Sequence, residues 1–214
     1  MIRVEQFKFN PFGENTYFLI DNSSRECVII DCGALGEDEE KEIETFVTEH
    51  KLNPIRLVAT HGHFDHNFGI SFIYREYGLP LEIYQRDYDL LMTMPNQAET
   101  LAGIHLEQEQ LNVKTFDDNY SFTIGDTTFS VIPTPGHTKG SVCFYSESAN
   151  MLFSGDTLFR GTIGRTDLPY GSIFQMTNSL RRLCQLPDET IIYPGHGPST
   201  TMAIELSTNP FLDR

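Results

Sequence analysis

The sequence predicts an α/β (α+β) fold in which sheets pack together and helices cover them on the outside. Strand-like segments alternate with helix-like ones, and their order is similar in the two halves of the chain. No linker, low-complexity stretch or repeated motif separates these halves. The hydrophobic share of 39% is typical of a globular protein, so we expect a single domain over residues 1–214.

The first half contains three strand-like runs before its first helix-like segment. Turn-forming residues such as Asn10-Pro11-Phe12-Gly13 separate the runs, which alternate or are continuously apolar. The spacing of Ile43, Phe46 and Val47 then forms one apolar stripe of a helix among acidic residues. The expected elements are strands at residues 4–9, 16–20, 27–30 and 55–59 and helices at residues 38–52 and 67–77.

The second half follows an irregular stretch, residues 86–120, which we expect to form short helices and loops. Strands return from Phe122 onward, and Gly-Asp and Ala-Asn turns separate them. Ile173, Met176 and Leu180 have the spacing of one helix face. The expected elements are strands at residues 127–132, 141–146, 150–154 and 190–193 and helices at residues 173–183 and 200–207.

The charge of the chain excludes some functions. Thirty acidic against fifteen basic residues give a net charge of −15, which repels polyanions and argues against a nucleic acid partner. No stretch approaches the ~18–20 apolar residues of a membrane span, and the first six residues mix charged and apolar types, unlike a signal peptide. We therefore expect a cytoplasmic protein with no membrane partner. Its four cysteines are widely scattered, which predicts free thiols.

Three of the seven histidines crowd into His61-Gly62-His63-Phe64-Asp65-His66, directly after a predicted strand. In an extended segment, residues i and i+2 point to the same side, so His61 and His63 can bind one ion. Asp65 and His66 can face a second. A single histidine is more often an ordinary core or surface residue, but three beside a carboxylate at a strand end predict a metal site.

Three further ligand-type residues follow other predicted strands. Each stands next to a glycine in a short loop, where one such residue alone would be read as a turn. They are His137 in Pro135-Gly136-His137-Thr138, Asp156 in Ser154-Gly155-Asp156-Thr157, and His196 in Pro194-Gly195-His196-Gly197. Together with the first motif they complete two coordination shells. The set contains imidazoles and carboxylates without a thiolate, which suits two divalent ions, with zinc expected first and iron or manganese as alternatives.

These motifs, in this order, resemble the signature of the metallo-β-lactamase superfamily. The resemblance implies an αβ/βα sandwich of two mixed sheets, with a dinuclear site where the loops of the two sheets meet. It implies that His61, His63 and His137 bind the first metal, that Asp65, His66 and His196 bind the second, and that Asp156 bridges both. It also implies that Asp31, in Ile30-Asp31-Cys32-Gly33, is a hydrogen-bond partner of a ligand histidine.

Within that superfamily, residues 134–141, 154–159 and 164–167 resemble glyoxalase II-like (hydroxyacylglutathione hydrolase-like) enzymes. The expected function is therefore metal-dependent hydrolysis of a small-molecule thioester or ester. A hydroxide that bridges the metals attacks the carbonyl, and Asp65 accepts a hydrogen bond from it. A thiolate leaves without a strong acid, because the pKa of a thiol is ~8.5.

The chain departs from glyoxalase II proper in three places. It is expected to lack the C-terminal helical region that helps to bind glutathione, since it ends at Arg214. Asp167 stands where the family has a tyrosine, and Gly197-Pro198 follows the last ligand histidine where the family has another. The sequence therefore does not predict which acyl group and which thiol the substrate contains. Arg160 and Arg165 are expected at the mouth of the pocket, where they bind an anionic group or pair with an acid such as Asp167.

Other functions remain open at this point. A persulfide dioxygenase resembles the same branch but uses one iron, held by two histidines and an aspartate, which this chain also contains. A lactonase or another ester hydrolase is a further alternative. A catalytically silent scaffold is disfavoured, because none of the seven ligand positions has changed type. The oligomeric state is not predicted.

Overall fold

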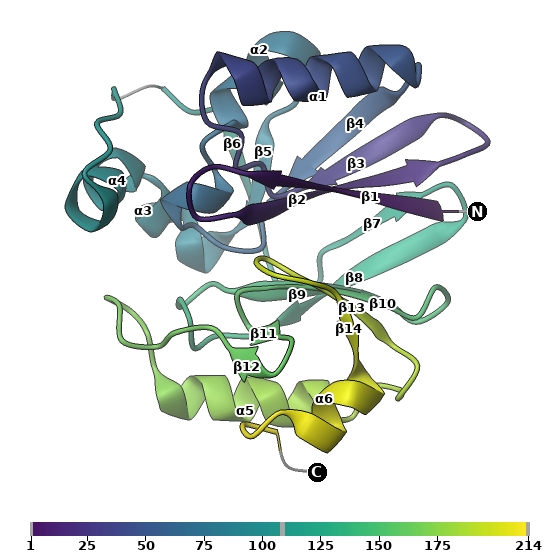
Figure 1. Cartoon of the computed structure of the whole chain (residues 1–214), viewed down its shortest axis with the longest axis vertical. Helices are drawn as coiled ribbons and strands as arrows, with labels where there is room; N and C mark the ends of the chain where they lie inside the picture. Colours follow the sequence, from purple (N-terminus) through teal and green to yellow (C-terminus); the bar gives the residue numbers. More distant parts are fainter. Residues whose placement is uncertain (1, 108–109, 213–214) are drawn as a thin grey trace.

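Two six-stranded sheets face each other in the computed structural model, which describes residues 2–107 and 110–212 (Figure 1). Helices cover the outer face of each sheet (Figure 1). Each sheet combines parallel with antiparallel neighbours, so both are mixed. The αβ/βα sandwich expected from the sequence is therefore confirmed.

The six strands of the first sheet lie side by side in the order of the chain. They are β1 (Ile2–Phe9), β2 (Glu14–Asp21), β3 (Glu26–Ile30), β4 (Asn53–Val58), β5 (Leu81–Tyr84) and β6 (Val113–Phe116). Two helices cover this sheet, and two others lie at one end of it (Figure 1). The covering pair is α1 (Glu37–Glu49) and α2 (Ile70–Tyr77), and the pair at the end is α3 (Tyr88–Leu91) and α4 (Met94–Ala102).

The second sheet has the strand order β14-β13-β10-β9-β8-β7. Its strands are β7 (Ser121–Ile124), β8 (Thr127–Pro133), β9 (Val142–Ser146), β10 (Met151–Gly155), β13 (Ile191–Pro194) and β14 (Thr200–Thr201). A separate hairpin pairs β11 (Leu158–Phe159) with β12 (Thr162–Ile163). Helices α5 (Ile173–Leu183) and α6 (Met202–Thr208) cover the outer face (Figure 1).

Side chains of β2 alternate between two cores, because successive residues of a strand point to opposite faces. Phe18 packs between the first sheet and its helices, whereas Leu19 packs between the two sheets. A third core lies between the second sheet and its helices and contains Leu152 and Met176. β2 is therefore buried along its whole length, and the inner core holds the two sheets face to face.

Parallel pairing explains why distant site residues begin in neighbouring loops. In the second sheet β10 and β13 are parallel, with Gly155 opposite Pro194, so the loops that carry Asp156 and His196 start side by side. In the first sheet β3 and β4 are parallel, with Ile30 opposite Val58. Asp31 therefore enters the same region as the histidine-rich segment that follows β4.

The middle of the chain differs from the sequence prediction. The short helices α3 and α4 are present as expected, but residues 81–84 and 113–116 form strands β5 and β6, which the prediction missed. Each has only four residues, and they pair in parallel with each other, Leu81 opposite Val113. Pairing between such distant segments leaves little local signal. The prediction also missed the β11–β12 hairpin, because each of its strands has only two residues.

Several element boundaries also differ from the prediction. α1 ends at Glu49, not at residue 52. The expected helix at residues 67–77 begins only at Ile70, because Phe64–His66 forms a separate 3₁₀ turn and the amide of Asn67 binds carbonyls of that loop. β4 begins at Asn53, not at residue 55. The closing helix begins at Met202, not at residue 200, because β14 pairs with β13 before the helix starts.

The four cysteines are buried and form no disulfide bond, as expected. Burial raises the pKa of the Cys27 thiol to about 12 and that of Cys143 to about 11. Within the described part of the chain, we find no helix with the length and apolar character required to cross a membrane.

Candidate metal centre

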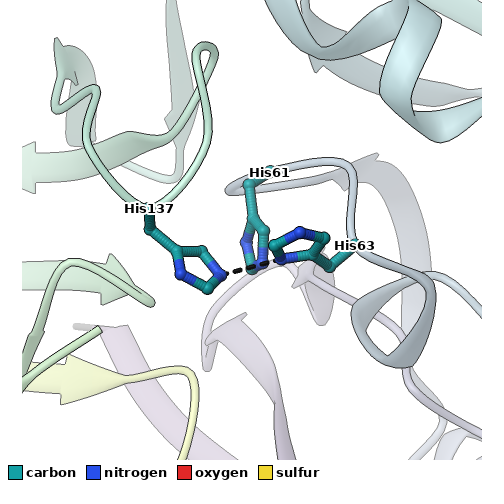
Figure 2. Close-up of side chains that lie close together, drawn as sticks. All are labelled: His61, His63 and His137. Atoms are coloured by element: carbon teal, nitrogen blue, oxygen red, sulfur yellow. Dashed lines mark hydrogen bonds between the residues drawn. The ribbon is translucent and has the colours of Figure 1, made fainter. Parts of the chain in front are cut away.

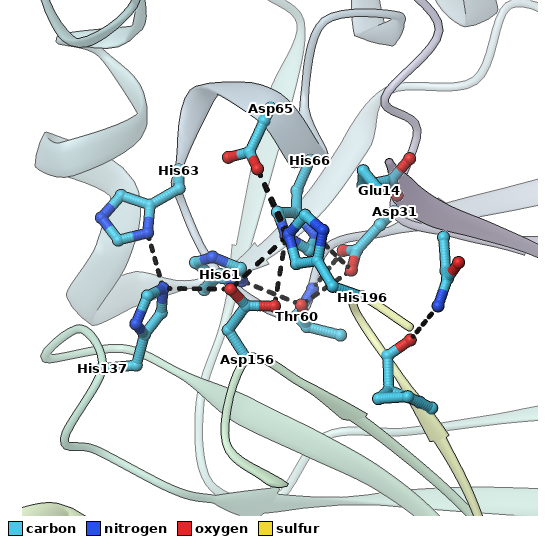
Figure 3. Close-up of polar contacts among 12 residues, drawn as sticks. Glu14, Asp31, Thr60, His61, His63, Asp65, His66, His137, Asp156 and His196 are labelled. Atoms are coloured by element: carbon cyan, nitrogen blue, oxygen red, sulfur yellow. Dashed lines mark hydrogen bonds and ion pairs between the residues drawn. The ribbon is translucent and has the colours of Figure 1, made fainter. Parts of the chain in front are cut away.

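The loops after four strands bring the seven predicted ligand residues together at one edge of the sandwich (Figure 3). Four of them belong to the segment after β4, and the others follow β8, β10 and β13. In chain order these residues are His61, His63, Asp65, His66, His137, Asp156 and His196. The two sheets therefore contribute donors to one site, as the sequence predicts.

The first cluster consists of three histidines, His61, His63 and His137, whose rings converge (Figure 2). One nitrogen from each lies within 4.8 Å of the others. The Nδ1 atom of His63 is 2.8 Å from the Nε2 atom of His137. All three side chains are buried, so this is a small, enclosed set of nitrogen donors from two sheets.

The second cluster contains Asp65, His66 and His196, whose ligand atoms also lie within 4.8 Å of one another. The Nε2 atoms of His66 and His196 are 3.2 Å apart. The Nε2 atom of His196 lies 3.3 Å from Asp65 Oδ2. An imidazole pair with a carboxylate has the donor types that bind zinc, iron or manganese.

Asp156 lies between the two clusters (Figure 3). Its Oδ1 atom is 3.3 Å from His66 Nε2, and its Oδ2 atom is 3.5 Å from His137 Nε2. The same Oδ2 atom is 3.7 Å from His196 Nε2. One carboxylate is thus within reach of ions bound at either cluster.

Hydrogen bonds fix which nitrogen faces the centre in three of the histidines. The Nδ1 atom of His66 donates to Asp31 Oδ2 over 3.0 Å, and that of His137 donates to the carbonyl of Arg165 over 2.8 Å. The Thr60 hydroxyl donates to Asp31, so it accepts from His61 Nδ1. The Nε2 atoms of these three rings therefore point inward, toward the centre.

Two observations show that the centre suits cations. The Nε2 atom of His61 is buried and has no hydrogen-bond partner among the described residues, which is unfavourable unless something binds it. Burial lowers the pKa of His66, but Asp156 and Asp65 outweigh it and hold that pKa well above its ordinary value. The carboxylates thus favour positive charge at this position.

The protonation states of His63 and Asp156 also match a metal-binding set. Burial and the adjacent His137 lower the pKa of His63 to about 3, so its ring is neutral near pH 7. Burial raises the pKa of Asp156, but His66, His137 and His196 outweigh it and hold the pKa well below its ordinary value. Neutral imidazoles and ionised carboxylates are the forms that bind divalent metals. The donor set therefore fits a dinuclear site.

Sequence reasoning missed the residues of β2 that hold the His196 loop. The side-chain amide of Asn15 donates to the carbonyls of Pro194 and Gly197 over 2.9 and 2.8 Å. The hydroxyl of Tyr17 donates to the same Pro194 carbonyl over 2.7 Å. No short motif links β2 to residues so far along the chain, so only the pairing of the sheets shows this contact.

A cavity of about 250 Å³ adjoins the two clusters. Apart from cluster residues, the described lining contains the apolar side chains Phe12, Phe64, Leu101 and Leu168 and the guanidinium of Arg165. Arg165 lies at the mouth, as predicted, but its Nε and Nη2 atoms bind Asp167 over 2.8 and 2.7 Å. The structure does not bring Arg160 to the cavity; that residue is exposed in the β11–β12 turn.

Comparison with known families places the chain. The sequence profile of the metallo-beta-lactamase superfamily matches residues 10–196. That range contains both clusters, Asp156 and the strands that carry them. The chain belongs to the metallo-beta-lactamase superfamily.

Two named relatives cover almost the whole chain. The probable metallo-hydrolase YqgX of Bacillus subtilis is 33% identical over 205 residues, which are 95% of this chain and 94% of YqgX. The hydroxyacylglutathione hydrolase GloC of Haemophilus influenzae is 31% identical over 216 residues, 99% of either chain. The chain is thus similar to metallo-hydrolases along its full length.

Solved structures agree with this assignment. The BLEG-1 B3 metallo-beta-lactamase has a TM-score of 0.90 at 33% identity and covers 99% of this chain and 100% of its own. TTHA1623 in a di-iron-bound form has a TM-score of 0.86 at 34% identity, with coverage of 97% and 100%. ETHE1 from Myxococcus xanthus has a TM-score of 0.75 at 26% identity, with coverage of 98% and 83%.

Proposed function

We propose that this protein is a dinuclear metal-dependent hydrolase of thioester or ester bonds, of the hydroxyacylglutathione hydrolase type. The observation that carries the proposal is the position of Asp156, whose carboxylate faces His137 of one cluster and His66 and His196 of the other. Full-length similarity to the hydroxyacylglutathione hydrolase GloC supports the reaction class.

The proposed ligand roles follow the two clusters. His61, His63 and His137 hold one ion, and Asp65, His66 and His196 hold the other, with Asp156 between them. A pair of divalent ions supplies a polarised carbonyl oxygen and a water-derived nucleophile near neutral pH. We propose zinc as the metal, with iron and manganese as alternatives, and similarity to TTHA1623 in a di-iron-bound form supports testing iron.

Asp65 is the proposed hydrogen-bond acceptor for the attacking water. It lines the cavity, and although burial raises its pKa, His66 and the hydrogen bond from His196 outweigh this and keep the pKa below its ordinary value. An ionised carboxylate accepts hydrogen bonds only, so Asp65 can orient the attacking water.

The cavity favours a substrate whose leaving group needs no acid. Outside the two clusters and Asp156, its described lining offers apolar side chains and a guanidinium, neither of which gives up a proton near neutral pH. A thiolate leaves unaided, because a thiol has a pKa of ~8.5, far below that of an alcohol. We therefore place thioesters before esters.

The test is hydrolysis by the full chain, loaded separately with Zn²⁺ and Fe²⁺, with metal per chain measured on the same sample. S-lactoylglutathione and the uncharged acetyl thioester of N-acetylcysteamine are the substrates. We expect two ions per chain and thiol release.

The Asp156→Asn variant should lose about 100-fold or more in turnover. The control is Glu205→Gln, a buried carboxylate on α6 that should leave turnover unchanged. Two bound ions without hydrolysis of either substrate would contradict the proposal.

One observation favours a second candidate, a mononuclear iron persulfide dioxygenase. The buried His61 and His66 and the half-buried Asp156 form a group of two histidines and one carboxylate with ligand atoms within 4.8 Å. That ligand combination is typical of non-haem iron oxygenases. Oxygen uptake with glutathione persulfide, by protein that holds one iron per chain, would select this candidate over hydrolysis.

A further inference from the structure

Asp87 is a buried carboxylate outside the ligand set, and it contacts two segments that come from different halves of the chain. It ends the 3₁₀ turn after β5 and is 1% exposed. Its Oδ2 atom accepts hydrogen bonds from Gly62 N over 2.9 Å and Thr138 Oγ1 over 2.6 Å. Its Oδ1 atom accepts one from Gly140 N over 2.7 Å. The carboxylate thus joins three donors of the protein.

These donors flank the histidines of the first cluster. Gly62 lies between His61 and His63, and Thr138 follows His137 directly. One carboxylate therefore fixes the separation between the loop after β4 and the loop after β8. The two loops must meet closely, since His63 Nδ1 and His137 Nε2 are only 2.8 Å apart.

The glycines at both contacts are independent evidence that the Asp87 segment packs closely against the two loops. A Cβ atom on Gly62 would lie 2.9 Å from the carbonyl oxygen of Asp87, and one on Gly140 would lie 2.5 Å from its backbone nitrogen. Distances this short require the backbone to shift. Each loop therefore has a glycine where the Asp87 segment packs against it.

The second cluster is held by other groups. Asp31 binds His66, Asn10 donates to the carbonyl of Asp65 over 2.8 Å, and Asn15 holds the carbonyls on either side of Gly195-His196. Within the described part of the chain, the side chain of Asp87 makes its hydrogen bonds to Gly62, Thr138 and Gly140 and not to these segments. The contacts of Asp87 are thus confined to the first cluster.

We propose that Asp87 is a positioning residue for the first metal cluster: by holding Gly62, Thr138 and Gly140 on one carboxylate, it sets the distance at which the three histidines meet an ion. A carboxylate suits this role because it accepts at both oxygens. Asparagine has the same size, but an NH2 group replaces one of the two oxygens. That group would face one of the protein's own donors and could not accept its hydrogen bond. The inference depends on the proposed metal centre but not on thioester hydrolysis.

The test measures Zn²⁺ affinity by competition with a chromophoric chelator, in two backgrounds that isolate the clusters. His196→Ala disables the second cluster, and His63→Ala disables the first. Adding Asp87→Asn should weaken Zn²⁺ binding about 10- to 100-fold in the His196→Ala background. It should change binding by less than about twofold in the His63→Ala background, because Asp87 does not touch the second cluster.

Glu205 is a matched control in another part of the molecule. It is 0% exposed and accepts from Gly161 N, Thr200 Oγ1 and Asn209 Nδ2 over 2.8, 2.6 and 2.8 Å. Glu205→Gln should lower thermal stability, as Asp87→Asn does, yet leave Zn²⁺ affinity within about twofold in both backgrounds.

Two results would overturn the proposal: unchanged Zn²⁺ affinity of folded Asp87→Asn in the His196→Ala background, or an equal loss in both backgrounds, which would mean general destabilisation. If circular dichroism shows that Asp87→Asn does not fold, Thr138→Val replaces it, since it removes the hydrogen bond to Asp87, together with the one to Ser141 Oγ, at nearly constant volume. Thr138→Val should weaken the first cluster about three- to tenfold, and no change there would equally overturn the proposal. Failure of the unsubstituted chain to bind Zn²⁺ would instead contradict the metal centre itself.

Discussion

His66 donates its Nδ1 hydrogen to the carboxylate of Asp31 over 3.0 Å, and the two side chains are 0% and 2% exposed. Asp31 also accepts from the backbone nitrogen and the hydroxyl of Thr60. Because Thr60 in turn contacts His61, one buried carboxylate orients a histidine of each cluster. Substitution of Asp31 should therefore change metal affinity, although Asp31 is not itself one of the proposed ligands.

Asp31→Asn tests that effect. Asp31 has a φ of 56°, which asparagine tolerates better than most residues, so this substitution spares the backbone. The neutral amide cannot stabilise the His66 ring as a carboxylate does, so we expect about 10- to 100-fold weaker Zn²⁺ binding at the second cluster. Calorimetric titration of the full chain measures it. Unchanged affinity in a folded variant would show that the Asp31–His66 bond has no influence on metal binding.

Asp167 is the ion-pair partner of Arg165, which lines the cavity. It binds Arg165 through two hydrogen bonds, and this pair is exposed to solvent and therefore only weakly held. Asp167→Asn should free the guanidinium to bind an anionic substrate, and we expect kcat/KM for S-lactoylglutathione to rise about three- to tenfold. Hydrolysis of the uncharged acetyl thioester should not change.

The double variant Arg165→Met, Asp167→Asn is the control for this prediction. If the gain comes from the released guanidinium, the double variant should lose it. A gain that persists without Arg165 would assign the effect to removal of a negative charge near the site.

Phe12 is expected to contact the substrate. It lies in the turn between β1 and β2, packs edge-on against Phe64 with ring centroids 5.3 Å apart, and is 41% exposed beside the cavity. Phe12→Ala should raise KM for an aryl thioester about fivefold or more, because it removes apolar contact area. It should cost only about 0.5 kcal/mol of stability, since the ring is already partly in water.

Phe174→Ala is the matched control for Phe12→Ala. Phe174 is 74% exposed on α5 and does not belong to the described lining of the cavity. Its replacement should leave KM unchanged. Equal effects of the two substitutions on KM would contradict a role of Phe12 in substrate binding.

The buried thiols predict an alkaline limit of stability. Burial raises the pKa of Cys27 to about 12 and that of Cys143 to about 11, so both stay protonated in the folded protein. In the unfolded chain thiols ionise near pH ~8.5. The free energy of unfolding should therefore fall as the pH rises from about 9 toward 11. Denaturant titrations at several pH values measure this fall.

Thiol labelling provides a separate check on the same cysteines. At pH 8 Ellman's reagent should react with the native protein far more slowly than with free cysteine, because the thiols are both buried and protonated. In denaturant all four should react. Rapid labelling of the native protein would contradict their burial.

The seven ligand candidates could be located from the sequence because each stands in a short motif at the end of a strand. Asp31 could be located for the same reason, and the structure places it against His66. Asp87 could not, because its partners Gly62 and Thr138 lie far from it in the chain and no spacing rule connects them. The role of such a residue can be recognised only in the folded structure, where its distant partners lie beside it.

In the fold, too, elements with a local sequence pattern were predictable, and elements that depend on distant segments were not. α5 was predictable because its apolar residues repeat at helical spacing, and Met176 and Leu180 are indeed buried. β5 and β6 were not, since a four-residue strand depends on its neighbour in the sheet. The ion pair of Arg165 with Asp167 was one of two alternatives from the sequence, and only the structure selects it.

The two clusters also impose an order on the maturation of the chain. During synthesis the segment after β4 emerges first, with four donors but without a complete partner set for either ion. The first cluster can close only when His137 has left the ribosome, and the second only when His196 has followed. If the centre binds two ions as proposed, a nascent chain can complete the donor set for the first ion before that for the second.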